Sequence, residues 1–212
     1  MKRGGLATAV IILVLIIDQV LKIWVKTHFY LGEDFEITSW FYLHFIENNG
    51  MAFGMELGSK IFLTIFRIVV VAALIYYLLK IRSRREFPTG YLIMIALVIA
   101  GAAGNIIDCM FYGVIFNDPF PPQVATMFPA SGGYAPVMMG RVVDMLYFPI
   151  FSFDWPGWMP IVGGEHFIFF QPVFNFADAA ISVGMIAIIL FYSRYITLYF
   201  DKKPVKDETE QH

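Results

Sequence analysis

The chain has 212 residues, of which 58% are hydrophobic and 15% are charged, and its formal net charge is −2. A water-soluble domain of this size could not bury so much apolar surface, so the composition predicts an integral membrane protein. A charge this close to neutral, without a basic stripe, excludes nucleic acid as a partner. The single cysteine, Cys109, excludes an internal disulfide and a cysteine-rich metal site.

Four apolar stretches are long enough to cross a bilayer as helices. Each has roughly 20 residues and therefore covers roughly 30 Å. The first follows Met1-Lys2-Arg3, as a signal peptide would, but it continues through Asp18 and Lys22 without a small-residue cleavage site, so we expect it to be retained. The predicted helices are residues 6–26, 61–80, 89–110 and 174–195.

The basic residues predict the orientation of these helices. With four spans, ten of the 15 lysines and arginines fall on one side, which the positive-inside tendency makes cytoplasmic. We therefore expect both termini inside, one membrane domain over residues 1–200 and a disordered cytoplasmic tail at 201–212. The ten residues are Lys2, Arg3, Lys80, Arg82, Arg84, Arg85, Arg194, Lys202, Lys203 and Lys206.

The two outward segments, 27–60 and 111–173, are predicted to differ in structure. Residues 35–46 are aromatic and β-branched, which favours short strands in a small sheet over the helix ends. Segment 111–173 is rich in proline and glycine, so we expect a long irregular outer loop, extended only at 142–150. The predicted fold class is an all-α membrane protein with four transmembrane helices and a small extracytoplasmic sheet.

Polar residues are predicted to converge at the outer boundary. Asn105 and Asp108 lie three apart near the outer end of the third helix, and Asn175 and Asp178 repeat that spacing where the fourth begins. Asp144 lies in the loop between them. An ionised carboxylate near hydrocarbon costs several kcal/mol unless it is paired, hydrated or protonated, so two of them at one depth mark a working site. Asp144 and Asp178 are therefore the candidate catalytic residues.

Two carboxylates in one site support a definite chemistry. They cannot both ionise easily, so one keeps a proton while the other activates a water molecule. The pair titrates as a unit, so the sequence assigns neither aspartate a separate role. This chemistry needs no metal and no cofactor, and the scattered histidines contain no His-Glu-x-x-His run of a zinc protease.

Several of these polar residues also have a structural interpretation. Asp18 and Lys22, at i and i+4, are predicted to form an ion pair inside the membrane. Asn105 and Asn175 could serve only as hydrogen-bonding links between helices. For Asp108 the sequence leaves two roles open, namely fixing Asn or Arg partners and contacting substrate.

Other functions are possible for paired membrane carboxylates. A proton-coupled transporter also uses carboxylates and amides, but it needs them near the midplane and in broken helices. Here they gather at the outer helix ends, which favours a protease. A scaffold without chemistry would leave two carboxylates unexplained.

Five motifs in this order resemble lipoprotein signal peptidase, the type II signal peptidase of bacteria. The resemblance extends from about residue 18 to residue 181. The motifs are Asp18-Gln19 with Lys22, Glu47-Asn48-Asn49-Gly50-Met51-Ala52-Phe53-Gly54, Gly104-Asn105-Ile106-Ile107-Asp108, Gly140-Arg141-Val142-Val143-Asp144 and Phe174-Asn175-Phe176-Ala177-Asp178.

The resemblance implies an aspartic endopeptidase of the bacterial inner membrane. Such an enzyme removes the signal peptide of a prolipoprotein just before the cysteine that carries a diacylglyceryl group, and globomycin-type compounds inhibit it. Asp144 and Asp178 would be its catalytic dyad at the outer face. We expect a monomer that contacts membrane lipid. The implied supporting or substrate-binding residues are Asn48, Gly50, Asn105, Asp108, Gly140, Arg141 and Asn175.

This sequence departs from the family pattern at Cys109, where the family usually has arginine. One hypothesis is that Arg141 supplies the missing cation to a carboxylate or to a substrate carbonyl. Segment 111–173 is also longer than is usual in the family. A second hypothesis is that residues 48–54 and residues near Tyr147 clamp the extended substrate.

Overall fold

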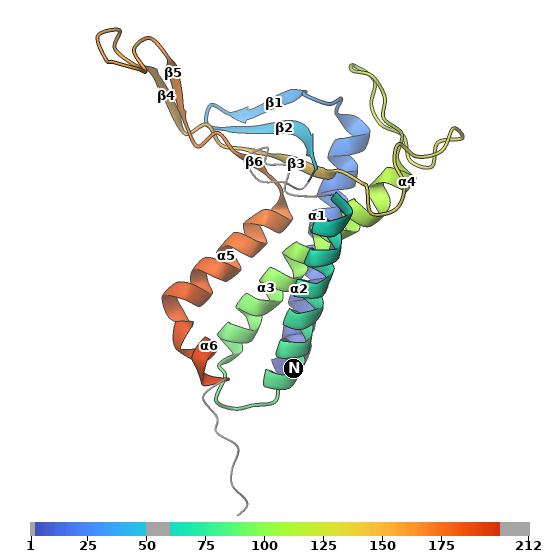
Figure 1. Ribbon diagram of the computed structural model, residues 1–212, viewed down its shortest axis with the longest axis vertical. Helices are drawn as coiled ribbons and strands as arrows, with labels where there is room; N and C mark the ends of the chain where they lie inside the picture. Colours follow the sequence, from blue (N-terminus) through green and yellow to red (C-terminus); the bar gives the residue numbers. More distant parts are fainter. Residues whose placement is uncertain (1–2, 50–59, 200–212) are drawn as a thin grey trace, which may run out of the picture.

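The computed structural model describes residues 3–49 and 60–199. A bundle of long helices carries a sheet across one end, and the N-terminus lies at the opposite end (Figure 1). Gly50, most of the proposed 48–54 clamp and the predicted tail at 201–212 lie outside the described residues.

The first two predicted helices agree with the observed ones to within three residues, whereas the third extends further. It passes into a π-helical turn and ends five residues beyond the predicted limit of 110. The helices are α1 (Arg3–His28), α2 (Lys60–Ile81), α3 (Thr89–Ile107), the π-helical η2 (Asp108–Tyr112), α4 (Gly113–Ile115), α5 (Phe176–Phe191) and α6 (Ser193–Leu198).

The fourth predicted helix, 174–195, is shorter than expected and interrupted. It begins at Phe176, because Asn175 has an extended backbone and caps the helix. It ends at Phe191, because Tyr192 leaves the helical conformation with φ −128° and ψ 9° before α6 follows. The 16 residues of α5 cover about 24 Å, less than a hydrocarbon core.

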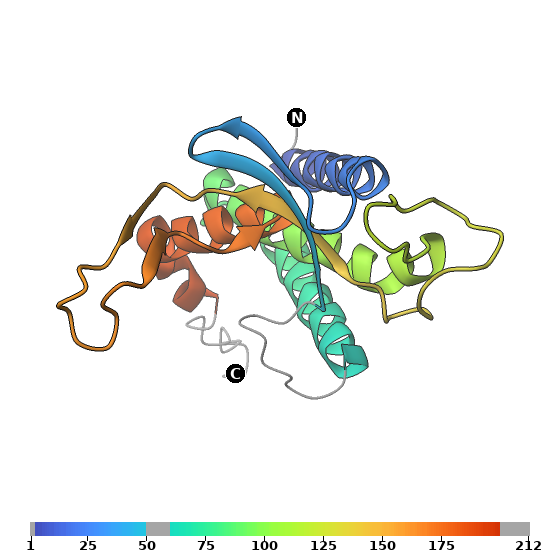
Figure 2. The ribbon, with the colours of Figure 1, turned by 90° about the horizontal axis from the view of Figure 1, so that it is seen from above.

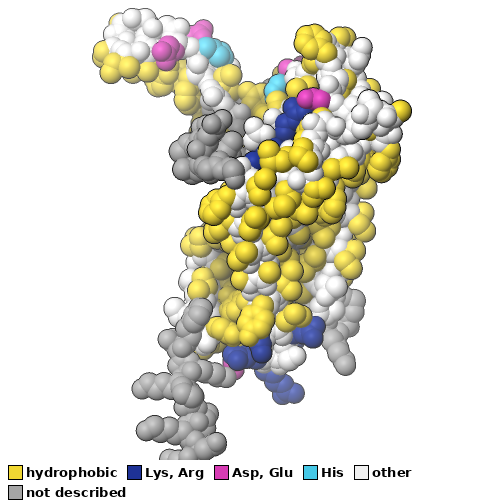
Figure 3. Space-filling view, turned by 45° about the vertical axis from the view of Figure 1, so that its right-hand side comes forward, with side chains coloured by type: hydrophobic (Ala, Val, Ile, Leu, Met, Phe, Trp, Pro, Cys, Tyr) yellow, Lys and Arg dark blue, Asp and Glu magenta, His cyan; other side chains and the backbone are white. Residues whose placement is uncertain are grey.

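Three helical stretches within the described residues are long and apolar enough to cross a membrane: Arg3–His28, Lys60–Ile81 and Thr89–Ile115. Their outward side chains are largely apolar, and the space-filling view shows a broad apolar band with arginine and lysine below it (Figure 3). This distribution is that of a multi-pass membrane protein.

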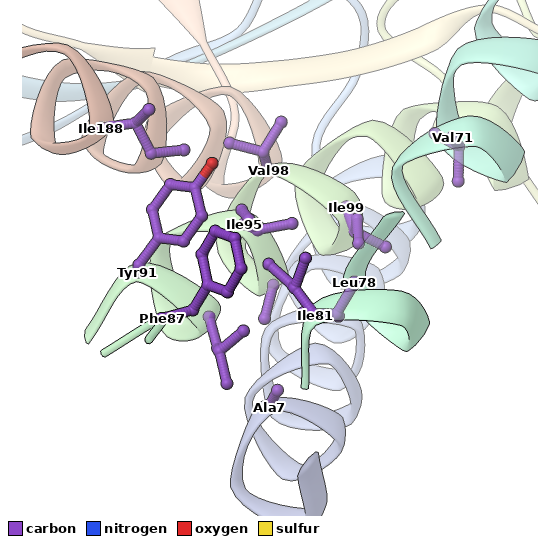
Figure 4. Close-up of a cluster of buried hydrophobic side chains, with 12 residues drawn as sticks. Ala7, Val71, Leu78, Ile81, Phe87, Tyr91, Ile95, Val98, Ile99 and Ile188 are labelled. Atoms are coloured by element: carbon purple, nitrogen blue, oxygen red, sulfur yellow. The ribbon is translucent and has the colours of Figure 1, made fainter. Parts of the chain in front are cut away.

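The helix α3 is the centre of the bundle, since α1, α2 and α5 all pack against it. Its side chains Tyr91, Ile95 and Ile99 fill an apolar cluster with Ile81 of α2 and Ile188 of α5 (Figure 4). The contact with α5 is close at Gly101, where a Cβ atom would meet the carbonyl oxygen of Ala177. The glycine therefore sets the distance between the two helices.

Four strands form an antiparallel sheet over the helix ends opposite to the N-terminus, in the order β1-β2-β3-β6 (Figures 1 and 2). The extended region predicted at 35–46 falls in β1 and β2 of this sheet, and of the region predicted at 142–150 the part up to Tyr147 forms β3. A separate hairpin of β4 and β5 was not predicted, since its residues were assigned to the irregular loop. The strands are β1 (Asp34–Thr38), β2 (Phe41–Asn48), β3 (Val142–Tyr147), β4 (Phe151–Asp154), β5 (His166–Phe169) and β6 (Val173–Phe174).

Substituting Gly101→Ala should destabilise the protein, because the added methyl group must push α5 away from α3. Overpacking of this kind costs about 1–3 kcal/mol. Thermal unfolding in detergent measures the loss. Gly5→Ala in α1 is the matched control, since a Cβ atom there meets nothing within 4 Å. Equal transition temperatures for the two variants would contradict the close-contact argument.

Candidate active site

The strand β3 positions Asp144 through the alternation of its side chains. The neighbouring Val143 packs into an apolar cluster, so Asp144 points to the opposite face. Ile46 of β2 lies across from Asp144, which makes Asn48 its diagonal neighbour on that face. The side-chain amide of Asn48 donates to Asp144 Oδ2, and Asn175 Nδ2 donates to Asp144 Oδ1 at 2.7 Å. The carboxylate of Asp144 is therefore held on both oxygens.

The first turn of α5 positions Asp178. Asn175 is the N-cap, and its side-chain oxygen accepts from the backbone N–H of Asp178 at 2.9 Å. Asp178 Oδ2 accepts in return from the backbone N–H of Asn175 at 3.4 Å, which completes a capping box. Asp178 Oδ1 accepts from Asn105 Nδ2 of α3 at 2.8 Å. Helix capping and the site therefore use the same two side chains.

Two asparagines join the two aspartates. Asn175 Nδ2 donates to Asn105 Oδ1 at 3.2 Å as well as to Asp144, while Asn105 donates to Asp178. The structure thus brings Asn48, Asp144, Asn105 and the capping pair into one hydrogen-bonded group at the end of the bundle that carries the sheet. Asp144 is 1% exposed, whereas Asp178 is only half-buried. Among the described residues, Asp178 is therefore the more accessible of the two aspartates.

A buried ionic layer supports this group from below. Lys22 is 0% exposed, and its Nζ lies 2.7 Å from Asp108 Oδ2 and 3.0 Å from Asp18 Oδ2. It also donates to Asn105 Oδ1 at 2.8 Å. Gln19 Nε2 donates to Asp18 Oδ2 and Asp108 Oδ1, both at 3.0 Å. The ammonium of Lys22 and the side-chain amide of Gln19 therefore each contact both buried carboxylates, those of Asp18 and Asp108.

Two further contacts tie this ionic layer to the elements of the site. Asp18 Oδ1 accepts from the backbone N–H of Ala177 at 2.9 Å, which attaches α1 to the first turn of α5. Asp108 is fully buried, and Val143 N–H lies 3.5 Å from its Oδ2. Its charged partner is Lys22, so the structure favours neither of the two roles that the sequence left open for Asp108.

Burial first, and then the negative charge of Asp178, raise the pKa of Asp144, which reaches about 7. The hydrogen bonds from Asn175 and Asn48 act in the opposite direction, because they stabilise the ionised carboxylate. A carboxyl group that titrates near neutral pH can donate a proton at physiological pH and take it back.

Gly140 acts through its backbone. A Cβ atom at Gly140 would meet the carbonyl oxygen of Asp108, and the backbone N–H of Gly140 donates to the carbonyl of Cys109 at 2.8 Å. The chain that leads into β3 therefore passes directly over the end of α3. This passage delivers Asp144 to the end of the helix that carries Asn105.

The hypothesis that Arg141 pairs with a catalytic carboxylate needs correction, whereas its alternative, contact with a substrate carbonyl, stays a prediction. Its guanidinium lies 3.0 Å from Glu47 and 2.7 Å from Asp118, and it covers the ring of Tyr134. Positions 141 and 144 are three residues apart in an extended chain, so their side chains point to opposite faces. Arg141 therefore anchors the outer segment rather than Asp144.

A different arginine reaches Cys109. Arg67 of α2 directs its Nη1 at Cys109 Sγ, 3.6 Å away. The cation near position 109 thus comes from the neighbouring helix α2. Arg67 and Cys109 are far apart in the sequence, so this contact was not predicted.

The buried pair of Lys26 and Glu47 was not predicted from the sequence. Lys26 follows Lys22 by one helical turn, and Glu47 directly precedes Asn48, so both positions carried a signal. Glu47 binds Lys26 and Arg141 on the face of β2 opposite to Asn48. This pair joins α1, the sheet and the outer segment.

The chain matches the model of a known protein family, signal peptidase (SPase) II, over residues 10–194. A lipoprotein signal peptidase of Porphyromonas gingivalis is 50% identical over 206 residues, which cover 97% of this chain and 91% of the relative. One from Amoebophilus asiaticus is 35% identical over 186 residues, with 84% of this chain and 74% of the relative covered. The chain belongs to the signal peptidase II family, and the family is one of bacterial membrane proteases.

Two solved structures, both described as a bacterial membrane enzyme determined by the in meso method, share the fold. The 1.9 Å structure has a TM-score of 0.58 and 26% identity, with 93% of this chain and 95% of that chain covered. The 2.3 Å structure also has a TM-score of 0.58, at 24% identity, and covers 98% and 95%. These comparisons give no support to the transporter alternative.

Replacing Lys22 by methionine should destabilise the protein strongly, because Asp18 and Asp108 would stay buried without their cation. Removing one partner from a buried ionic cluster costs about 3–5 kcal/mol. Thermal unfolding measures the effect. The triple variant Asp18→Asn/Lys22→Met/Asp108→Asn, which removes all three charges, should recover part of the loss. An unchanged transition temperature for Lys22→Met would contradict the argument.

Proposed function

We propose that this protein is an aspartic endopeptidase that cleaves the signal peptide from diacylglyceryl-prolipoproteins just before the lipidated cysteine. The observation that carries this proposal is the joining of Asp144 and Asp178 through Asn105 and Asn175 at the outer end of the bundle. Its curated relatives are named lipoprotein signal peptidases, which supports the substrate class.

Asp144 and Asp178 divide the chemistry in this proposal. The carboxyl group of Asp144, with its pKa of about 7, holds the shared proton, and the carboxylate of Asp178 accepts a proton from water. The water oxygen then bonds to the scissile carbonyl carbon while Asp144 protonates the carbonyl oxygen. Asp178 passes its proton to the leaving nitrogen, the C–N bond breaks, and Asp144 regains its proton from the diol.

The placement of the site suits a substrate that arrives as a membrane helix. The aspartates lie at the end of the bundle opposite to Arg3, Arg82 and Arg85, so we place the site at the outer face and both termini in the cytoplasm. In this arrangement α5 and α6 together form the fourth crossing beside α3. The signal peptide unwinds at the outer boundary, and the diacylglyceryl chains remain in the bilayer.

The supporting contacts imply how partners bind. The substrate segment whose peptide bond reaches Asp144 and Asp178 has an extended backbone beside Asn48. Globomycin-type inhibitors bind at this same place. The hydrogen bonds of Asn48, Asn105 and Asn175 hold both aspartates within one chain, and we keep the monomer as part of the proposal.

Removing either ionisable group should abolish cleavage. Asp144→Asn and Asp178→Asn keep the size of the side chain but cannot carry the proton, so each should lower turnover by at least about 100-fold. A gel-shift assay with purified diacylglyceryl-prolipoprotein measures this. Thermal unfolding shows whether each variant still folds. Folded variants that cleave at the wild-type rate would overturn the proposal.

The pH profile should identify the protonated group. Cleavage should fall as the pH rises above about 7, because Asp144 then loses the proton it must donate. In Asn48→Ala the declining limb should move to higher pH, since the hydrogen bond that stabilises ionised Asp144 is lost. Asn49→Ala is the matched control, as its side-chain oxygen accepts from Lys60 instead. If the declining limb of the pH profile moves equally in both variants, or in neither, the group that titrates is not Asp144.

A further inference from the structure

The hairpin of β4 and β5 projects obliquely from the sheet end of the bundle, sideways on the side of α5 and with its tip pointing away from the helices (Figures 1 and 2). It forms its own two-stranded sheet, separate from the four-stranded one. A two-stranded hairpin is marginally stable in water unless it packs on something. The form of this hairpin therefore raises the question of what surface it rests on.

One face of the hairpin is entirely aromatic, and we call it the aromatic face. The register pairs Phe151 with Phe169 and Phe153 with Phe167, which puts all four rings on one side. The rings of Phe151 and Phe169 stack at 4.8 Å, those of Phe153 and Phe167 lie 5.1 Å apart, and Trp155 contacts Phe153 at 4.8 Å. The rings thus form one continuous layer.

The opposite face of the hairpin is mainly polar, and Ile168, across from Ser152, is the one apolar residue among its paired positions. Asp154 lies across from His166, and the two side chains are 2.6 Å apart. Ser152 shares this face and is exposed. In the space-filling view the acidic and histidine side chains of the projecting arm lie on its upper side, and its underside is apolar (Figure 3). The hairpin is therefore two-faced, with the polar side away from the helix bundle.

Within the described residues the aromatic face is largely uncovered. Phe151 is 49% exposed, Phe169 is 44% exposed and Phe153 is 38% exposed. The outer face of α5 below it is also apolar and exposed, with Val183, Ile186 and Leu190 on one stripe. The aromatic face of the arm and this stripe of α5 are thus both apolar and exposed.

We propose that the aromatic face of the β4–β5 hairpin rests on the outer leaflet of the bilayer, at the boundary between headgroups and acyl chains. Phe and Trp side chains favour this depth, and the polar face with Asp154 and His166 is left in water. A lipid surface fits better than a protein partner, because the aromatic face lies on the underside of the arm, toward the side of the helix bundle (Figure 3), and carries no charge.

This contact has a consequence for the site. The hairpin is inserted between β3, which carries Asp144, and β6, which leads directly into Asn175 and α5. An arm that rests on the leaflet therefore fixes the height of both elements above the acyl chains. The lipid contact itself does not depend on the proposed function. Its consequence for the site does, because it rests on the proposed cleavage next to a lipid-anchored cysteine.

Tryptophan fluorescence tests the contact in the full-length protein in nanodiscs. A variant with Trp24→Phe, Trp40→Phe and Trp158→Phe keeps only Trp155, on the aromatic face. Replacing phosphatidylcholine by its acyl-chain-brominated form should lower the Trp155 emission about twofold or more, because bromine quenches only indoles at the membrane. Thermal unfolding verifies that the variant is folded.

The matched control places the indole on the polar face. In the same background, with Trp155→Phe added, Ser152→Trp should keep its emission in brominated lipid. Ile168→Trp, across from Ser152, repeats the control if that variant does not fold. Unquenched Trp155, or equal quenching on both faces, would overturn the proposal. Quenching that appears only when lipidated substrate is added would assign the arm to the substrate instead.

None of these outcomes depends on catalysis. Asp144→Asn in the Trp155-only background should give the same quenching as the parent variant, since the substitution leaves the hairpin intact. A failure of the lipid contact and a failure of the proposed cleavage are therefore separate results.

Discussion

The rest of the structure depends on the buried ammonium of Lys22. Two carboxylates, of Asp18 and Asp108, could not remain below the outer boundary without it, and the same group donates to Asn105. Through Asn105 it touches the hydrogen-bonded group that holds the aspartates, and through Asp18 it holds the first turn of α5 at Ala177. A single cation thus joins α1, α3 and α5 at the depth where the chemistry is proposed.

Strand alternation then divides the polar residues into two functions. On one face of β2 and β3, Asn48 and Asp144 point toward the site. On the other face, Glu47 binds Lys26 and Arg141, and it holds the outer segment against the sheet. Residues adjacent in sequence therefore act in separate networks, and a shift of one position would exchange them.

The two aspartates differ because their elements differ. Asp144 lies in a buried strand, where removal of water raises its pKa to about 7. Asp178 lies half-buried in the first turn of a helix and accepts a backbone N–H. Equivalent carboxyl groups in the sequence thus gain distinct environments, which is the physical basis for giving them distinct roles in the proposed reaction.

The sequence by itself determined the membrane class, the apolar helices and the motifs of the family, because hydrophobic length and local spacing are properties of the linear chain. The i, i+4 spacing of Asp18 and Lys22 and the strand-forming run at 35–46 are of this kind. Only the tertiary structure decided that Lys22 also binds Asp108, that Arg141 faces away from Asp144 and that the loop contains an aromatic hairpin. Those outcomes depend on register and on contacts between residues far apart in the chain, and a linear pattern does not encode which faces meet.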